Sequence, residues 1–477
     1  MTTKLVSDFT AHNVSTPLNY NATTYPAQTG TQALFTGKTN RHGTVFAIDK
    51  TLMDDSQNAA SPMVISKESV RNLMPADWPG RIAMHAQVWW GLSSHPNIGF
   101  NDQDAATMQA ICNDIKVRGY DVFIPDWYHP TKSTVANDTT VDVIATACQS
   151  AGLKFMVMID QQYFDAQRST RATYQADLIF AINHLMGRYA SHPAYEHNSR
   201  IGGVSRPLIL LWGIASRVGP NVDWNVVRSA VAPHSNPLII QYQASGFGVT
   251  QSDGALAWLD TNADSAGKPV SGVSYLTGSF LQACTANQSK ICISSVTKGF
   301  NGTLTRNVSW SLNKYLDQQD GFTWLDWWAT NRAYVAGGKH LDYVATITLD
   351  DFQEGSAVQC GIRTAVKINA GPVAGNVITF SVTGDERTMR QYNLWGSLDG
   401  VTVTLLASVL PGATKQFDLT NLPGLVTPGT YTLYVEGQGM PSLENQMAPQ
   451  TFIQRLSLFG GGTGIGGGPT QPMETGP

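Results

Sequence analysis

Eight stretches of apolar, β-branched residues alternate with helical patterns between residues 81 and 351, and few folds accommodate such an order. Most of these stretches are continuous apolar runs, which is typical of parallel strands covered on both faces. The predicted strands cover residues 81–90, 121–128, 154–160, 206–213, 236–244, 254–260, 290–300 and 343–351.

Apolar residues at helical spacing predict helices between several of these strands. The helices cover residues 102–119, 139–152, 170–190 and 323–338. The link between the fifth and sixth strands is too short for a full helix. Strands that alternate with helices in this number predict an α/β fold, a (β/α)8 TIM barrel. An open doubly wound sheet is the alternative, but no G-x-G-x-x-G turn follows the first strand.

The pattern differs on either side of the barrel, which we expect to span residues 81–358. Residues 1–80 have weak periodicity and predict an irregular N-terminal extension. Residues 359–459 hold short alternating strands separated by turn residues, which predict an antiparallel β-sandwich. Residues 460–477 are rich in glycine and proline and predict a flexible tail.

The charge balance argues against two classes of partner, nucleic acid and anionic membranes. The net charge is −4 and no Lys/Arg cluster stands out, so we expect no nucleic-acid partner. No run approaches the length of a membrane span. Charged residues make up only 14%, whereas Trp (12) and Tyr (16) are frequent, as in many extracellular and sugar-handling proteins.

The first residues lack the apolar region of a classical signal peptide. Three alternatives follow: a cytosolic protein, export by another route, or a signal removed beforehand. On the basis of the composition and of these alternatives, we expect an extracellular or virion-associated protein.

The five cysteines show no metal-ligand spacing, so we expect neither a metal nor a cofactor. Cys112 and Cys148 lie on helical patterns and are expected to be buried as small hydrophobic residues. Cys284 and Cys292 are spaced to close a short loop under oxidising conditions, although an odd count argues against a disulfide scaffold.

In TIM barrels the active site lies at the carboxyl ends of the strands, so the residues at these positions are the candidates for substrate binding. They combine flat rings with carboxylates and amides, the groups that stack on sugar rings and bind hydroxyls. The candidates are Asp350, His85, Trp89, Trp90, Asp126, Trp127, Asp160, Gln161, Trp212, Tyr242, Trp258 and Asn301. A polysaccharide is therefore the expected partner. Structural roles remain alternatives: the Trp rings as plugs of the barrel, and the Asp residues as helix caps.

The eighth strand ends in three carboxylates, Asp350, Asp351 and Glu354, within the sequence ATITLDDFQEG. Carboxylates this close repel one another, which costs stability and raises at least one pKa. Such strain is commonest at functional sites, so this acid cluster is the candidate catalytic centre.

The order of motifs resembles the clan of (β/α)8 glycoside hydrolases that contains family 99, endo-α-mannosidases, and family 71, endo-α-1,3-glucanases. D-D-F-Q-E-G lies between the N-E-W-H-E-G motif of family 99 and the N-D-Y/F-G-E-S motif of family 71. The segments HLMGRYASHPAYEHNSRIGGVSRPLILLWG, TKGFNGT and VFIPDWY resemble further family segments in the same order. The resemblance covers residues 81–358, with Asp351 in place of the first Glu of family 99.

The resemblance implies hydrolysis of an α-mannan or α-glucan, with Glu354 as general acid and Asp351 as base. In family 99 the corresponding base acts on the sugar's own 2-hydroxyl, whereas in an inverting enzyme it would activate water. Two alternatives stay open: a non-catalytic glycan-binding or structural protein, and a virion-associated depolymerase or adhesin.

Overall fold

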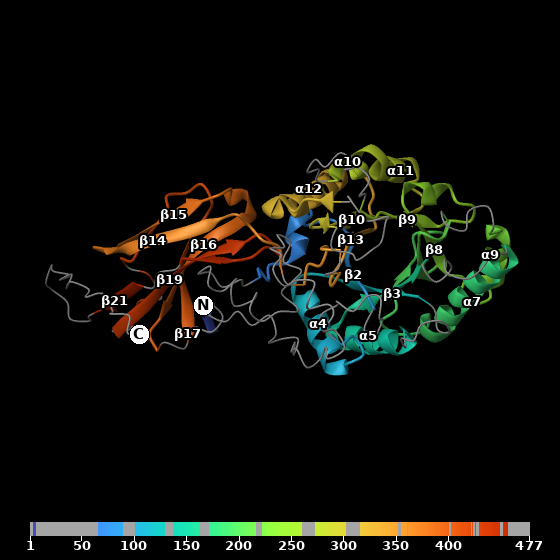
Figure 1. The fold of residues 1–477 in the computed structure, drawn as a ribbon, viewed down its shortest axis with the longest axis horizontal. Coiled ribbons are helices and arrows are strands. Elements are labelled where there is room, and N and C mark those ends of the chain that lie inside the picture. The colour runs from blue at the N-terminus through green and yellow to red at the C-terminus, as the bar shows by residue number, and fades with distance from the viewer. Residues whose placement is uncertain are drawn as a thin grey trace, which may run out of the picture.

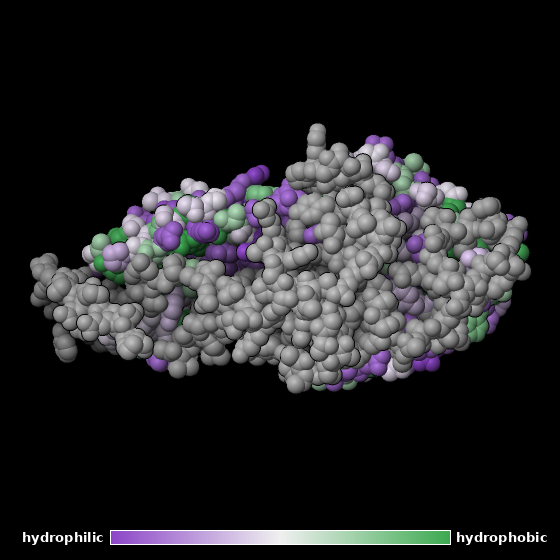
Figure 2. Space-filling view, in the orientation of Figure 1, coloured by the Kyte–Doolittle hydropathy of each residue, from purple (hydrophilic) through white to green (hydrophobic). Residues whose placement is uncertain are grey.

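The computed structural model describes residues 3–5, 65–88, 101–128, 137–161, 171–215, 222–259, 272–301, 315–351, 354–359, 361–399, 402–420, 422, 425, 429–448 and 452–456. Within these residues the chain forms a barrel beside an antiparallel β-sandwich (Figure 1). On the face in Figure 2, hydrophilic and hydrophobic residues are mixed wherever the described surface is visible.

Eight parallel strands close the barrel, because the first strand pairs with both the second and the eighth. The third strand is interrupted and consists of two segments, β4 and β5. The strands are β2 (Arg81–Ala86), β3 (Val122–Trp127), β4 (Lys154–Phe155) with β5 (Val157–Asp160), β7 (Arg206–Trp212), β8 (Leu238–Tyr242), β9 (Gly254–Leu256), β10 (Ile291–Val296) and β13 (Tyr343–Thr346). The TIM barrel predicted from the alternation is confirmed, and the doubly wound alternative is excluded because the sheet closes.

Helices cover the outside of the barrel, and the four predicted ones are present. They are α4 (Ala105–Val117), α5 (Asn137–Ala151), α7 (Arg171–Tyr189) and α12 (Phe322–Ala336). The sequence pattern missed α9 (Trp224–Val231) and the helical run of α10 (Val273–Tyr275), η7 (Leu276–Phe280) and α11 (Leu281–Ala286). Between β8 and β9 only the short 3-10 helix η5 (Ala244–Gly248) forms, as the length of that link predicted.

Strand residues alternate between two cores. Alternate side chains point inward and fill the barrel, as Ala83, Ile124 and Leu210 do, whereas their neighbours pack against the helices. This alternation decides which strand-end residues can reach a site at the barrel mouth.

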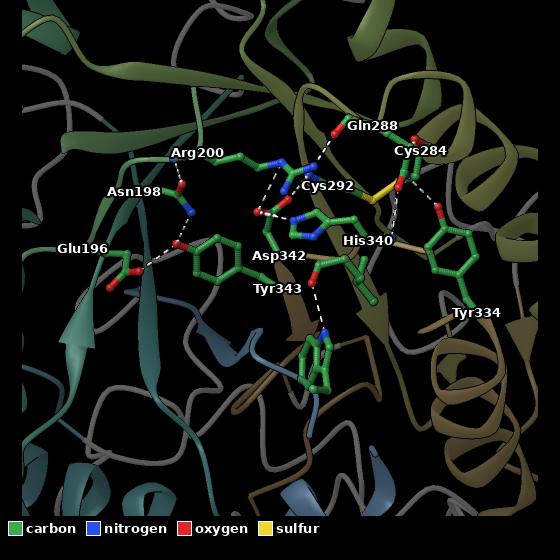
Figure 3. A network of polar contacts seen from close by, with 12 residues as sticks. Glu196, Asn198, Arg200, Cys284, Gln288, Cys292, Tyr334, His340, Asp342 and Tyr343 are labelled. Carbon is green, nitrogen blue, oxygen red and sulfur yellow. Dashed lines mark hydrogen bonds and ion pairs between the residues drawn. A yellow bond between two sulfur atoms is a disulfide. The ribbon is translucent and has the colours of Figure 1, made fainter. Parts of the chain in front are cut away.

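Polar contacts connect the segments at the amino-terminal end of the barrel (Figure 3). Glu196 binds Arg81 of β2 and accepts a hydrogen bond from the Tyr343 hydroxyl at 2.7 Å. Asp342 accepts from the backbone N–H of Cys292 at 2.9 Å and binds His340. Because the charged groups shown there have partners, we interpret the amino-terminal end of the barrel as structural.

Cys284 and Cys292 form a disulfide between α11 and β10. The pairing that the sequence left open is therefore present. Cys112 and Cys148 are both buried and free, as predicted, with their sulfur atoms 3.8 Å apart.

The β-sandwich consists of two antiparallel sheets around one apolar core, as predicted. One sheet has the order β1 (Thr3–Leu5), β17 (Thr402–Val409), β16 (Met389–Ser397), β19 (Gly429–Gly439) and β20 (Gln446–Met447), with β21 (Phe452–Leu456) beside β19. The other has the order β14 (Lys367–Ala374), β15 (Val377–Thr383) and β18 (Gln416–Asp418). The strand β1, from the start of the chain, completes the edge beside β17.

The turn between β19 and β20 attaches the sandwich to the barrel. Leu443 in this turn is fully buried within the helix-facing core of the barrel. Arg118 at the end of α4 donates to the hydroxyl of Ser442 at 2.9 Å, and Trp324 of α12 donates to the carbonyl of Pro441 at 3.0 Å. The contact combines apolar burial with directional hydrogen bonds.

Candidate active site

Six residues form one layer directly above the apolar filling of the barrel, and we call them the polar layer. Each follows an inward-pointing apolar residue by two positions, so the alternation of the strand directs it inward as well. His85 follows Ala83, Asp126 follows Ile124, and Trp258 follows Leu256. The layer consists of His85, Asp126, Asp160, Trp212, Tyr242 and Trp258.

Aromatic rings in the polar layer contact one another in a row, although several of them come from strands that are not adjacent around the barrel. His85 meets Trp258 edge-on at 5.0 Å between ring centroids, and Trp258 meets Trp212 at 5.7 Å. Trp212 in turn meets Tyr242 at 5.3 Å. Such edge-to-face contacts orient the rings relative to one another.

Carboxylates gather around Asp126, whose side chain is almost completely buried. Burial raises its pKa well above the ordinary value, and the charges of Asp160, Asp350 and Asp351 raise it further. These acids come from β3, from β5 and from the segment after β13. The fold thus concentrates carboxyl groups at the carboxyl ends of the strands.

Asp350 lies fully buried next to the end of β2. Its Oδ1 accepts a hydrogen bond from the backbone N–H of Gln87 at 2.8 Å. Burial raises its pKa well above the ordinary value; the Gln87 bond opposes this, and the charges of Asp351 and Asp102 add to it.

Several buried polar atoms in this region have no hydrogen-bond partner. Both ring nitrogens of His85 are in this state, as are Gln87 Oε1, Asp126 Oδ1, Trp212 Nε1 and Asp350 Oδ2. Burial lowers the pKa of His85 to about 3, so its ring is neutral at pH 7 and offers one donor and one acceptor. Native proteins pair nearly all buried polar groups, so a convergent set of unpaired ones marks a ligand site.

The two predicted catalytic acids lie on one tight turn after β13. Asp351 Oδ1 accepts from the backbone N–H of Glu354 at 2.8 Å, and its own N–H donates to Thr348 Oγ1 at 3.0 Å. Asp351 is buried, whereas Glu354 is partly exposed. The catalytic roles of both remain predictions.

A second segment supports this turn. The backbone N–H of Asn301, in β11 (Phe300–Asn301), donates to the carbonyl of Glu354 at 2.7 Å. Asn301 is therefore beside the predicted acids, and its main chain positions Glu354.

The predicted substrate-binding residue Gln161 packs closely against Gly213. A Cβ atom added to Gly213 would lie 2.3 Å from Gln161 Oε1.

Trp127 is a correction to the predicted substrate-binding set. It is one residue beyond Asp126, so strand alternation turns it outward into the helix-facing core. Its Nε1 donates to Asp138 of α5 at 3.0 Å and its ring stacks on His184 of α7. Trp89 and Trp90 lie outside the described residues.

Gln87 stands at the end of the first predicted strand but was not among the selected substrate-binding residues. It continues the inward row of Ala83 and His85, and its backbone N–H donates to Asp350.

Among the described residues, no group of three or more His, Cys, Asp or Glu side chains is arranged to hold a metal ion. No described helix is long and apolar enough to cross a membrane.

The chain is similar in structure to solved proteins but not to known families by sequence. No protein-family model matches the sequence, and no curated protein matches it. A solved structure of the GH99 endo-alpha-mannosidase from Bacteriodes thetaiotaomicron, in complex with BIS-TRIS-propane, is similar at 14% identity and a TM-score of 0.43. The match covers 62% of this chain and 89% of that one. It is a distant likeness at the level of the fold.

Proposed function

We propose that this protein is a glycoside hydrolase that cleaves an α-linked polysaccharide of the mannan or glucan type. The observation that carries the proposal is the polar layer, which combines contacting aromatic rings with buried polar groups that have unpaired atoms. Rings of this kind stack on the C–H faces of a pyranose, and the polar atoms bind its hydroxyls.

The absence of other chemistry in the described site supports this assignment. Phosphoryl transfer relies on clustered cationic groups or a glycine-rich phosphate loop, and the polar layer contains neither. A buried neutral imidazole and carboxyl groups suit a ligand rich in hydroxyls, because each hydroxyl donates one hydrogen bond and accepts others.

In the proposed reaction Glu354 protonates the leaving glycosidic oxygen and Asp351 acts as the base. The Glu354 N–H that points at Asp351 stabilises negative charge on that carboxylate, which suits a base. Whether Asp351 acts on water or on the 2-hydroxyl of the sugar decides between inversion and retention.

The test is the release of reducing ends from α-mannans, α-glucans and bacterial surface polysaccharides by the full-length chain. Glu354→Gln and Asp351→Asn keep the shape of each side chain, and we expect each to lower kcat by roughly 100-fold or more. Glu386→Gln, on the sandwich, is the matched control and should keep full activity. Thermal unfolding checks that the variants are folded.

Full activity of Glu354→Gln would refute the assignment of the acid. Binding of a glycan by the wild-type chain without release of reducing ends would favour the alternative, a glycan-binding or virion-associated adhesin on the same barrel. An extracellular or virion-associated location is part of this proposal, and fractionation of the producing culture tests it.

A further inference from the structure

The first barrel strand keeps its alternation beyond the point where β2 ends. Every second residue from the start of the strand lies in the helix-facing core: Ile82, Met84, Ala86 and Val88. Side chains of an extended chain point alternately to its two faces, so the residues between these four point into the barrel. Gln87 therefore points inward although it follows the last residue of β2, and it lies one step beyond His85 towards the barrel mouth.

The segment after β13 supplies hydrogen bonds that continue this first strand. The backbone N–H of Leu349 donates to the carbonyl of His85 at 2.7 Å, which extends the contact between β13 and β2. At the next step a side chain takes the place of a main-chain acceptor, because the N–H of Gln87 donates to Asp350 Oδ1 at 2.8 Å. Asp350 is fully buried, so water does not compete for this bond. Asp350 therefore fixes the main chain at Gln87 and, through it, the direction of the Gln87 side chain.

Gln87 holds a buried acceptor close to the predicted catalytic turn. The residue is 6% exposed, and its Oε1 has no hydrogen-bond partner. A buried amide oxygen is costly unless a ligand or a water molecule pairs with it. Asp350, which fixes Gln87, directly precedes the predicted base Asp351. The amide of Gln87 thus lies near the place of the proposed reaction.

We propose that Gln87 is a substrate-binding residue, whose amide oxygen accepts a hydrogen bond from a sugar hydroxyl beside the scissile bond, and that Asp350 is the positioning residue that holds it there. The strand-end position had marked Asp350 as a group that contacts the substrate itself, and this proposal gives it a different role. The inference rests on the proposed function, since it assigns a further residue to the same site.

The test is a double-mutant cycle on the full-length chain with Glu354→Gln, which prevents turnover. Dissociation constants for α-mannan and α-glucan oligosaccharides are measured by calorimetry. Gln87→Leu removes the amide and keeps a similar volume, and we expect it to weaken binding roughly tenfold. Asp350→Leu removes the acceptor for the Gln87 N–H and should weaken binding by a similar factor. Both changes together should weaken binding no more than about twofold beyond either alone, because Asp350 acts only through Gln87.

Two further variants complete the design. Asp350→Asn keeps an oxygen that can accept from the Gln87 N–H, so it should change the dissociation constant by less than about threefold. Gln109→Leu, at an exposed position of α4, is the matched control for Gln87→Leu and should leave binding unchanged. Thermal unfolding checks that each variant is folded. If Asp350→Leu does not fold, Gln87→Leu and Asp350→Asn decide by themselves.

The outcomes separate the two proposals. Unchanged binding in Gln87→Leu overturns the inference and leaves the proposed hydrolase intact. Losses that multiply in the double variant, or a loss of about tenfold in Asp350→Asn, overturn the positioning role, because Asp350 would then contact the substrate itself. If the wild-type chain neither binds nor cleaves either glycan, the proposed function fails and the inference fails with it.

Discussion

The contact between barrel and sandwich contains an acid whose charge should weaken the fold at high pH. Glu444 is buried in the turn between β19 and β20, and its Oε1 has no hydrogen-bond partner. Burial raises its pKa from 4.5 to about 7, although the charges of Arg363 and Lys298 oppose the rise. The protonated form is therefore the one that the folded protein favours.

The sign and the magnitude follow from linkage. A pKa higher in the folded than in the unfolded state means that stability is complete below about pH 4.5 and declines as the pH rises to about 7. Each pKa unit corresponds to about 1.4 kcal/mol, so ionisation of Glu444 costs about 3 kcal/mol at pH 8. At pH 5 less than about 1 kcal/mol of this cost is present.

The perturbation is Glu444→Gln, which keeps the shape and removes the charge. We expect it to raise the free energy of unfolding by about 3 kcal/mol at pH 8 and by less than about 1 kcal/mol at pH 5. In thermal unfolding of a chain of this length this corresponds to a gain in Tm of about 3 °C at pH 8. The assay is thermal unfolding of both chains at the two pH values, followed by circular dichroism.

Glu386→Gln is the matched control on the same sandwich. Burial acts to raise the pKa of Glu386, but the ion pair with Lys415 and the hydrogen bond from the backbone N–H of Gly412 outweigh it, so this pKa is lowered. The ionised Glu386 carboxylate therefore stabilises the fold above its unfolded pKa, and this stabilisation is lost as the pH falls. Glu386→Gln should accordingly not raise Tm at pH 8. Equal Tm shifts for Glu444→Gln at pH 5 and pH 8, or a lower Tm at pH 8, would refute the reasoning.

Further predictions concern the disulfide and two tryptophans. Replacing Cys284 and Cys292 together by Ser should lower the free energy of unfolding by about 2–3 kcal/mol, and a reductant should then have no further effect in denaturant unfolding; an unchanged midpoint would contradict this. Trp258→Ala should weaken glycan binding at least tenfold with little change in Tm, because the ring faces the polar layer. Trp127→Ala should leave glycan binding unchanged and lower the free energy of unfolding by about 3–5 kcal/mol, since its ring fills the helix-facing core. If calorimetry shows weaker binding only for Trp127→Ala, and unfolding shows lower stability only for Trp258→Ala, the side-chain directions inferred from strand alternation are wrong.

Much of the fold was predictable because barrel strands that are covered on both faces read as continuous apolar runs. The two short helical stretches that were missed, α9 and the run from α10 to α11, illustrate the limit. The π-helical segment η7 interrupts the helical spacing within the second of them, so its apolar residues do not follow one period.

The candidate site was predictable in position but not in every orientation. The rule that barrel sites lie at the carboxyl ends of strands selected His85, Asp126, Asp160 and Trp258. It also selected Trp127, because a strand-end position alone does not say which way a side chain points.

The sequence by itself determined the order of strands and helices, the polar and aromatic residues at the strand ends and the acids Asp350, Asp351 and Glu354. Those features are local, because they depend on the spacing of residue types along one chain. Only the tertiary structure decided three relations. The charge of Asp350 raises the pKa of Asp126, and the backbone N–H of Gln87 donates to Asp350. The turn that contains Leu443 attaches the sandwich to the barrel. These relations join residues far apart in the sequence, and burial and the neighbouring charges are set by the closure of the barrel rather than by any segment of it.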